Sequence, residues 1–216
     1  MTPIAPPKVA GRVRDFCERV SPGQTPIYLP VTPAPGAKLV DCFPTVQRQV
    51  ETAGGEMVIG WQIWLQPGIL IEAEFHSVWK APDDKLHDIT PKPSGTRRIL
   101  FLPDSRKVYD ERQVDNIREP LSDAPEVVEL IASFKADFEF KNRGRLATFH
   151  GDLRDVLTPA ELEELAVIDQ RKLKAQVAFA YRFSPEVIAA VSKGKLDRNG
   201  PCHCGSGRKY KQCHGR

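Results

Sequence analysis

Apolar and polar residues alternate along the centre of the chain. The alternation runs through residues 57–65 and again through residues 71–79, and a more continuous apolar run covers residues 98–102. A period of two is typical of a β-strand with one buried face. A turn at Pro82-Asp83-Asp84 leads into a further strand over residues 85–90. We therefore expect a small antiparallel sheet over about residues 57–102. Its buried face comprises Ile59, Trp61, Ile63, Leu65, Ile71, Ala73, Phe75 and Trp79.

On both sides of this sheet the apolar spacing changes to three and four residues. Before the sheet, this spacing predicts helices over residues 7–20 and 42–53, separated by a proline-rich segment, 21–38, that we expect to be extended. After it, residues 123–191 are predicted to be mostly helical. Two capping signals divide this half, Asp123 with Glu126 and Thr158 with Pro159 and Glu161, and a shorter helix is expected over 184–191. The predicted fold class is therefore α+β, a small antiparallel sheet with flanking helices.

Composition separates a body from a short tail. The chain has 216 residues, 41% hydrophobic and 27% charged, which suits one domain of ordinary size. We expect this domain over residues 1–192, a basic linker over 193–197 and a separate module over 198–216. No apolar run approaches the roughly 18 residues that a membrane span needs, and the first residues lack the pattern of a secretory signal. We therefore expect a cytoplasmic protein.

The tail holds most of the positive charge and most of the cysteines. Residues 193–216 carry a net charge of +6, whereas the whole chain carries +3, so the body is slightly acidic. Three of the five cysteines, Cys202, Cys204 and Cys213, also lie there. In a chain without a secretory signal, this clustering favours a metal site over disulfides.

The cysteines of the tail predict a structural zinc site. The segment has too little apolar surface to fold by burial alone, and a bound metal can supply the missing stability. Cys202, Cys204, Cys213 and His214 would give the closed tetrahedral ligand set of structural Zn²⁺. The alternatives are His203 as the fourth ligand, a metal-free tail, and a redox pair formed by the two close cysteines.

The tail resembles the SEC-C motif, the zinc-binding segment at the C-terminus of the bacterial translocase motor SecA. The resemblance runs from Arg198-Asn199-Gly200-Pro201-Cys202 through Gly205-Ser206-Gly207 to Cys213-His214-Gly215, and departs from the motif at His203, where proline is usual. It implies a bacterial interaction module that contacts the SecB chaperone, ribosomes or anionic lipid. Arg208, Lys209 and Lys211 would then face an acidic partner, unless they only keep the module soluble. No phosphate-binding loop is present in the sequence, which excludes ATP-driven translocation.

A second group of residues, in the body, has the composition of a catalytic triad. Cys42 lies at the start of a predicted helix, where the helix dipole favours a thiolate. A hairpin centred near Pro82 would place Asp88 opposite His76, because both residues are equally far from Pro82. The carboxylate would then orient the imidazole, as a cysteine nucleophile requires.

The order Cys42, His76, Asp88 on a helix and two strands resembles the transglutaminase-like branch of papain-type enzymes. The resemblance covers residues 40–92 and includes His76-Ser77-Val78-Trp79 and Asp88-Ile89-Thr90-Pro91. It implies that Cys42 attacks an amide or thioester carbonyl, that His76 carries the proton and that Asp88 orients His76. The chain departs from this pattern by one extra residue before Trp79, and it offers no evident oxyanion-stabilising Gln or Asn upstream of Cys42.

The same residues also have structural interpretations. Cys42 could be a packed side chain, and Glu72, Glu74 and His76 share a strand face that is either solvated or a divalent-metal site. Residues 110–118 are polar, and the sequence assigns them no role. Three tryptophans either pack in the core or line a pocket: Trp61, Trp64 and Trp79.

These patterns lead to functional hypotheses of different classes. The first is a zinc-binding adaptor whose tail docks onto an acidic partner such as a chaperone, a ribosome or a translocation component. The alternative is a cysteine-dependent hydrolase or acyltransferase that is localised by its tail. Nonspecific nucleic-acid binding is a weaker third hypothesis, because Tyr210 is the only aromatic residue beside the basic cluster.

Overall fold

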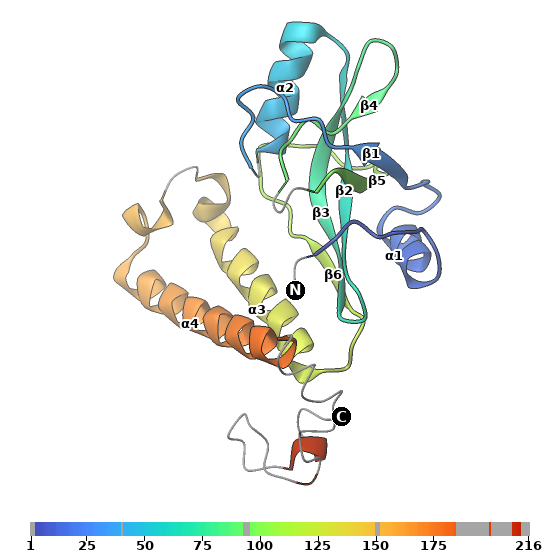
Figure 1. The fold of residues 1–216 in the computed structure, drawn as a ribbon. Coiled ribbons are helices and arrows are strands. Elements are labelled where there is room, and N and C mark those ends of the chain that lie inside the picture. Colours follow the sequence, from blue (N-terminus) through green and yellow to red (C-terminus); the bar gives the residue numbers. More distant parts are fainter. Residues whose placement is uncertain are drawn as a thin grey trace. The chain divides into compact units, whose positions relative to one another are not determined.

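The computed structural model describes residues 3–39, 41–92, 96–149, 152–184, 199 and 209–212. The chain forms two compact units, Thr2–Leu121 and Ser122–Arg216. Among the described residues, the first unit contains all the strands and the second is helical (Figure 1). The boundary expected near residue 193 lies outside the described residues. Within the described residues, no helix combines the length and the apolar character needed to cross a membrane.

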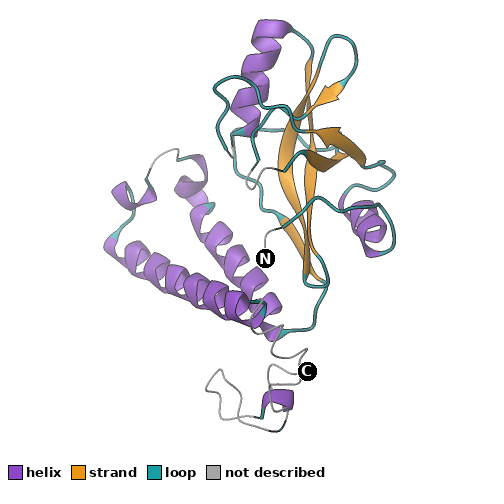
Figure 2. Cartoon of the chain, viewed as in Figure 1, coloured by secondary structure: helices purple, strands orange, loops and turns teal. Residues whose placement is uncertain are grey.

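The first unit is built on one antiparallel sheet, drawn in orange in Figure 2. The strand order is β1-β5-β2-β3-β4, and β6 pairs with a separate part of β3. The predicted antiparallel sheet is confirmed, and β1 and β6 add two strands that the alternation did not predict. The strands are β1 (Ile27–Pro30), β2 (Glu56–Gln66), β3 (Leu70–Lys80), β4 (Leu86–His87), β5 (Arg98–Pro103) and β6 (Ile117–Pro120).

The sheet nearly closes on itself. Val31, directly after β1, forms a parallel bridge with Asp88, directly after β4. The N–H groups of Thr32 and Ala34 extend this contact by donating to the carbonyl oxygens of Asp88 and Ile89 at 2.8 and 2.9 Å. Because β1 and β4 are the two ends of the strand order, the bridge joins the open edges of the sheet. The proline-rich segment is thus extended, as predicted, and it closes the sheet.

Two helices of the first unit, α1 (Arg12–Val20) and α2 (Cys42–Ala53), contribute to one core cluster with the sheet. Most of the strand residues predicted to face the core belong to this cluster, and Ile63 and Ile71 are fully buried in it. Helix α2 has the predicted bounds. Helix α1 begins later than residue 7, because Gly11 precedes it with a φ of 50° that is incompatible with a right-handed helix.

The opposite face of the sheet is also buried. Leu29, Val78, Ile99 and Phe101 form a second apolar cluster there. His76 lies on the same side of β3 as Val78 and is only 3% exposed. The expectation of a solvated face is therefore wrong for His76, because closure of the sheet turns that face inward.

The second unit is a pair of packed helices, α3 (Pro125–Lys141) and α4 (Pro159–Arg182). Two short 3₁₀ turns lie between them, η2 (Gly144–Thr148) and η3 (Leu153–Asp155). Phe140, Leu146, Leu157 and Leu165 form an apolar cluster in this unit. The helix expected over 184–191 falls almost entirely outside the described residues.

The two predicted helix caps differ in outcome. The box at Thr158 is confirmed, because its hydroxyl accepts from the Glu161 N–H while the Glu161 carboxylate accepts from the Thr158 N–H at 2.8 Å. The cap at Asp123 is wrong: Ala124 is the N-cap, with no side-chain hydrogen bond. Pro125 has the fixed φ that suits the first helical position, so the helix starts one residue later than an Asp123 cap requires.

Candidate active site

Cys42 is the first residue of α2. The hydrogen-bond ladder of the helix begins with the Thr45 N–H, which donates to the Asp41 carbonyl oxygen at 3.2 Å. The amides of Cys42 and Phe43 therefore have no acceptor within the helix, and Pro44 has no N–H. These two amides and the helix dipole concentrate partial positive charge beside the Cys42 side chain.

The start of α2 meets β3 where that strand has no neighbour on one edge. On the edge away from β2, β3 pairs with β6 through residues 70–73 and with β4 through residues 79–80. The edge between these ladders, residues 74–78, is therefore open. Within it, the backbone N–H of Ser77 donates to the Cys42 sulfur. The gap in the ladder thus gives the thiol direct access to the strand that carries His76.

His76 and Asp88 form a buried pair. His76 Nε2 lies 3.1 Å from Asp88 Oδ1, and the two side chains are 3% and 0% exposed. The same carboxylate oxygen accepts from the Thr90 N–H at 3.3 Å, which fixes its orientation. An ionised carboxylate can only accept, so this contact favours the His76 tautomer protonated at Nε2. That tautomer leaves Nδ1 for the hydrogen bond between His76 and Cys42.

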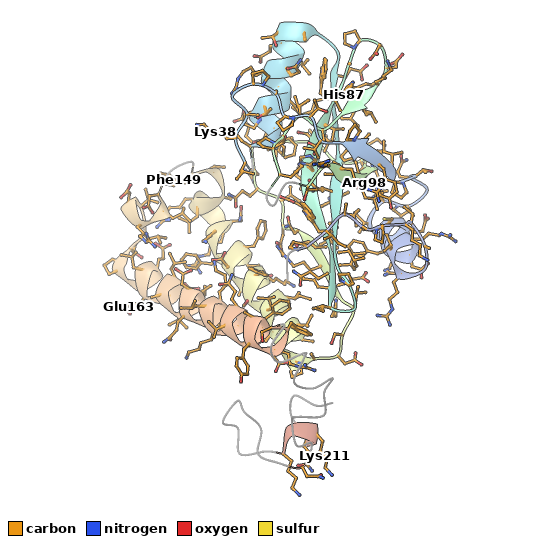
Figure 3. All side chains as sticks on the ribbon, in the orientation of Figure 1. Lys38, His87, Arg98, Phe149, Glu163 and Lys211 are labelled. Carbon is orange, nitrogen blue, oxygen red and sulfur yellow. The ribbon has the colours of Figure 1, made fainter. Side chains whose placement is uncertain are left out.

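The route by which Asp88 reaches His76 differs from the prediction. The β3–β4 ladder pairs Trp79 with His87, which is labelled in Figure 3, and so centres the hairpin one residue later than Pro82. Continued by one pair, this register would set Asp88 opposite Val78. The Asp88 and His76 side chains meet diagonally across the strands instead.

The three side chains change one another's proton affinity. Burial favours the neutral thiol of Cys42, but the hydrogen bond and charge of His76, the Ser77 amide and the Lys92 ammonium outweigh it and lower the Cys42 pKa. Burial likewise disfavours the imidazolium of His76, yet the hydrogen bonds to Asp88 and Cys42 raise its pKa. Burial opposes ionisation of Asp88 as well, and His76 and Lys92 outweigh it, so the Asp88 pKa is lowered. All three shifts favour a thiolate–imidazolium pair next to an ionised carboxylate.

The His76 ring is supported from inside the sheet. Gly60 is its cross-strand partner on β2. A Cβ at this glycine would lie 2.8 Å from the Phe101 ring and 2.2 Å from the Leu102 carbonyl oxygen. The absence of a side chain at Gly60 therefore lets Phe101 approach, and its ring meets His76 edge-on with centroids 6.4 Å apart.

Lys92 is a charged member of this group that the sequence analysis missed. Its Nζ lies 3.2 Å from His76 Nε2 and 3.0 Å from Asp88 Oδ2, and its side chain is 5% exposed. Hydrophobic periodicity identifies buried apolar residues and does not identify a buried lysine. The only feature of the sequence that pointed to this ion pair was the position of Lys92 four residues after Asp88.

Part of the polar segment that the sequence left without a role contacts this region. Glu72 pairs with Arg118 Nε at 2.7 Å and accepts from the Asn116 side chain at 2.8 Å. Just before that segment, the Tyr109 ring stacks on Phe43 with centroids 3.9 Å apart. The two ends of the segment 109–118 thus contact the start of α2, through Phe43, and β3, through Glu72.

The other interpretations of the strand residues gain no support. Glu74 accepts from the Trp64 indole, and the partners of Glu72 and His76 are those given above, so the three do not converge on one point. Among the described residues, no group of three His, Cys, Asp or Glu side chains is arranged to hold a metal. Trp61 is 1% exposed and donates to Asp104 at 3.1 Å, as expected of a packed side chain.

Little of the tail lies within the described residues. Lys209 and Lys211 are exposed, and Lys211 lies on the short turn η4 (Tyr210–Gln212), as labelled in Figure 3. The predicted zinc ligands Cys202, Cys204, Cys213 and His214, and the predicted contact residue Arg208, lie outside the described residues.

A comparison with protein families finds a match at the end of the chain. The SEC-C motif matches residues 198–216, the segment for which the sequence analysis expected it. This match covers only the end of the chain, and no solved structure matches the chain.

Proposed function

We propose that this chain is a cysteine-dependent acyl-transfer enzyme, a hydrolase or acyltransferase that acts on an amide or thioester. The observation that carries the proposal is a single buried ring, His76, that is hydrogen-bonded to both Cys42 and Asp88. A nucleophile, a base within hydrogen-bond reach and a group that orients the base are the recurring parts of such sites. A thiol that was merely packed would need neither the base nor the carboxylate.

In the first half of the proposed reaction, the Cys42 thiolate attacks the carbonyl carbon of the substrate. A carbon–sulfur bond forms and the carbonyl oxygen becomes an oxyanion. When the tetrahedral intermediate collapses, the bond to the amine or thiol leaving group breaks and the His76 imidazolium gives its proton to that group. The product of this half is a thioester on Cys42.

In the second half, His76 removes a proton from water or from an acceptor nucleophile, which attacks the thioester. The carbon–sulfur bond breaks and Cys42 leaves as the thiolate, so the resting state is restored. Water as the attacking group gives hydrolysis, and an amine or alcohol gives acyl transfer.

The start of α2 supplies the donors for the oxyanion. The sequence offered no Gln or Asn for this purpose, but the amides of Cys42 and Phe43 have no acceptor within the helix. Backbone amides beside the nucleophile can stabilise a tetrahedral oxyanion, and loss of one such donor costs about 2.7–4 kcal/mol in well-studied enzymes. These amides can take the place of the missing side chain.

An activated acyl ester tests the proposal without knowledge of the natural substrate. We expect p-nitrophenyl acetate to give a burst of about one equivalent of p-nitrophenol per chain, as an accumulating acyl-enzyme does. Mass spectrometry of the quenched protein should locate the acetyl group on Cys42. Cys42→Ala should abolish the burst, and Cys17→Ala should keep it.

Asp88→Asn separates an oriented base from a merely reactive thiol. An amide cannot hold His76 as a carboxylate does, so both the burst rate and the later turnover should fall while the fold, checked by circular dichroism, persists. A burst of equal size and rate in Cys42→Ala would contradict the proposal outright.

We further propose that the tail is a zinc-binding docking module, because the SEC-C motif matches residues 198–216. Three thiols and one imidazole are a donor set that suits structural Zn²⁺. Arg208, Lys209 and Lys211 would then meet an acidic protein surface, such as that of a chaperone or a ribosome. The ligands in this proposal are Cys202, Cys204, Cys213 and His214.

Elemental analysis of the purified chain tests the zinc proposal. We expect about one zinc per chain, as for a closed four-ligand site, and loss of that zinc in Cys213→Ser. Cys17→Ser is the matched control and should keep the metal. If the wild-type chain purified under reducing conditions holds no zinc, the proposal is wrong.

A further inference from the structure

The position of Lys92 suggests a role that neither the sequence nor the SEC-C match assigns. Burying an ammonium is unfavourable unless a counter-charge and hydrogen bonds compensate it. The described contacts of Lys92 Nζ are Asp88 Oδ2 at 3.0 Å and His76 Nε2 at 3.2 Å. Both are members of the proposed active site, so a purely structural ion pair has no reason to be placed here.

Each oxygen of the Asp88 carboxylate faces a different side chain. Its Oδ1 faces His76 Nε2 at 3.1 Å and its Oδ2 faces Lys92 Nζ at 3.0 Å. An ammonium can only donate and an ionised carboxylate can only accept. If Lys92 is held by Oδ2, then Oδ1 stays aimed at the ring and His76 keeps its proton on Nε2.

We propose that Lys92 is a positioning residue of this site: it holds Asp88 against His76 and sets the pH range in which Cys42 and His76 are both charged. This inference rests on the proposed function. A positive charge beside the pair favours the thiolate and disfavours the imidazolium. Both ionisations therefore take place at lower pH than they would without Lys92.

Other titratable groups lie near Cys42, and none of them contacts His76 or Lys92 in the described structure. One is the Tyr109 phenol, whose pKa is affected by the charges of Cys42 and of three nearby carboxylates. The elements on the inner side of His76 contribute Gly60 and Phe101, which carry no charge. The three carboxylates are Asp41, Asp110 and Glu111.

The test compares Lys92→Met with Lys92→Arg. The rate of Cys42 alkylation by iodoacetamide is measured against pH, with the alkylated cysteine identified by mass spectrometry. The protonation of His76 is followed by NMR of ¹⁵N-histidine-labelled protein. Each titration has a midpoint, one for ionisation of Cys42 and one for protonation of His76. In Lys92→Met we expect both midpoints to rise by about one pH unit, which is the lower end of the effect of a neighbouring charge. Lys92→Arg keeps the charge and should keep both midpoints close to those of the wild type.

Lys85→Met is the matched control. Lys85 directly precedes β4, pairs with Asp83 at 2.7 Å and has a 72% exposed side chain. Its loss removes the same charge without touching the site, so both midpoints should stay unchanged. A purely structural role for Lys92 would lower the unfolding temperature of Lys92→Met and leave the midpoints where they were, which would overturn the inference.

The failure of this inference differs from the failure of the proposed function. If Cys42 in the wild type forms its thiolate only at the pH of an ordinary thiol, the proposed function fails. If the wild-type midpoint is low and Lys92→Met matches it, only the role of Lys92 fails.

If Lys92→Met does not fold, the ¹⁵N NMR spectrum of the histidine-labelled wild type tests the inference instead. The neutral His76 ring must then be protonated at Nε2, and a ring protonated at Nδ1 would mean that the ammonium donates to Nε2 rather than to Asp88. That outcome would also overturn the inference.

Discussion

Cys17 and Cys42 lie in the same core cluster but in opposite electrostatic surroundings. Cys17 lies in the middle of α1 and is 2% exposed, and burial raises its pKa to about 11. Cys42 is 9% exposed, at the start of α2, and its pKa is lowered although burial alone would raise it. The difference comes from polar neighbours: a histidine, a backbone amide and a lysine. Burial makes a thiol inert, and only the groups placed around it make it reactive.

The largest expected effect comes from removing the base beside Cys42. In His76→Ala, alkylation of Cys42 by iodoacetamide at pH 7 should slow by roughly 30-fold or more, because a thiol with the ordinary pKa of about 8.5 is only a few per cent thiolate at this pH. Quantitative mass spectrometry of the two cysteine peptides gives both rates in one experiment. Cys17, which has no such partner, should react as slowly as before.

His87→Ala is the control for this change, because His87 lies on β4 and its ring packs at a tilt against Trp79 rather than against the thiol. It should leave both rates unchanged. If Cys42 in His76→Ala reacts as fast as in the wild type, the contrast between the two thiols does not originate in His76.

Loosening the packing around Cys17 should act on that thiol alone. Phe16 is fully buried beside it, and Phe16→Ala should lower the free energy of unfolding by about 3–5 kcal/mol. Local opening then exposes Cys17, so its alkylation should accelerate while the pH profile of Cys42 keeps its midpoint. Urea unfolding and the same two-peptide assay measure both effects.

Phe140→Ala provides the comparison for Phe16→Ala, since Phe140 is a buried phenylalanine in the core of the second unit. It should leave the Cys17 rate unchanged. Equal acceleration of Cys17 in both variants would show that general instability, rather than local packing, controls its access.

The smallest expected effect is a loss of stability at high pH. The Cys17 pKa is raised from 9.0 to about 11 in the folded chain, so its contribution to stability is complete below pH 9 and is lost as the pH rises through 11. Two pKa units correspond to about 2.7 kcal/mol. Relative to Cys17→Ala, the wild type should lose up to about that much unfolding free energy between these pH values. If the free energy of unfolding falls equally with pH in the wild type and in Cys17→Ala, the pKa of Cys17 is not raised in the folded chain.

Much of the first unit could be predicted from local pattern. The period of two gave the two long strands and one of their buried faces, and the helix that begins at Cys42 has its predicted bounds. The structure brings together the three residues proposed as a triad. Their types, and their positions at a helix start, on a strand and directly after the next strand, are local properties, which is why the sequence could indicate them.

Other features depended on contacts between distant segments. The second buried face required the bridge between Val31 and Asp88, and β6 pairs with β3 from a segment whose residues show no alternation. Lys92 was missed because a lysine becomes part of a buried site only when a carboxylate is already there to receive it. The offset of one residue in the hairpin centre likewise follows from the hydrogen-bond ladder between β3 and β4, and the residues of the turn did not predict it.

The sequence by itself therefore determined most of the order of elements, the positions of Cys42, His76 and Asp88 along them, and the SEC-C segment, because periodicity, capping and motif spacing are recorded in neighbouring residues. Only the tertiary structure decided that the inner face of the sheet is buried, that the gap in the β3 ladder admits the Cys42 thiol, and that Lys92 joins the group. Those outcomes depend on which backbone edges remain unpaired once the sheet has curled, and that is settled by hydrogen bonds between residues far apart in the chain.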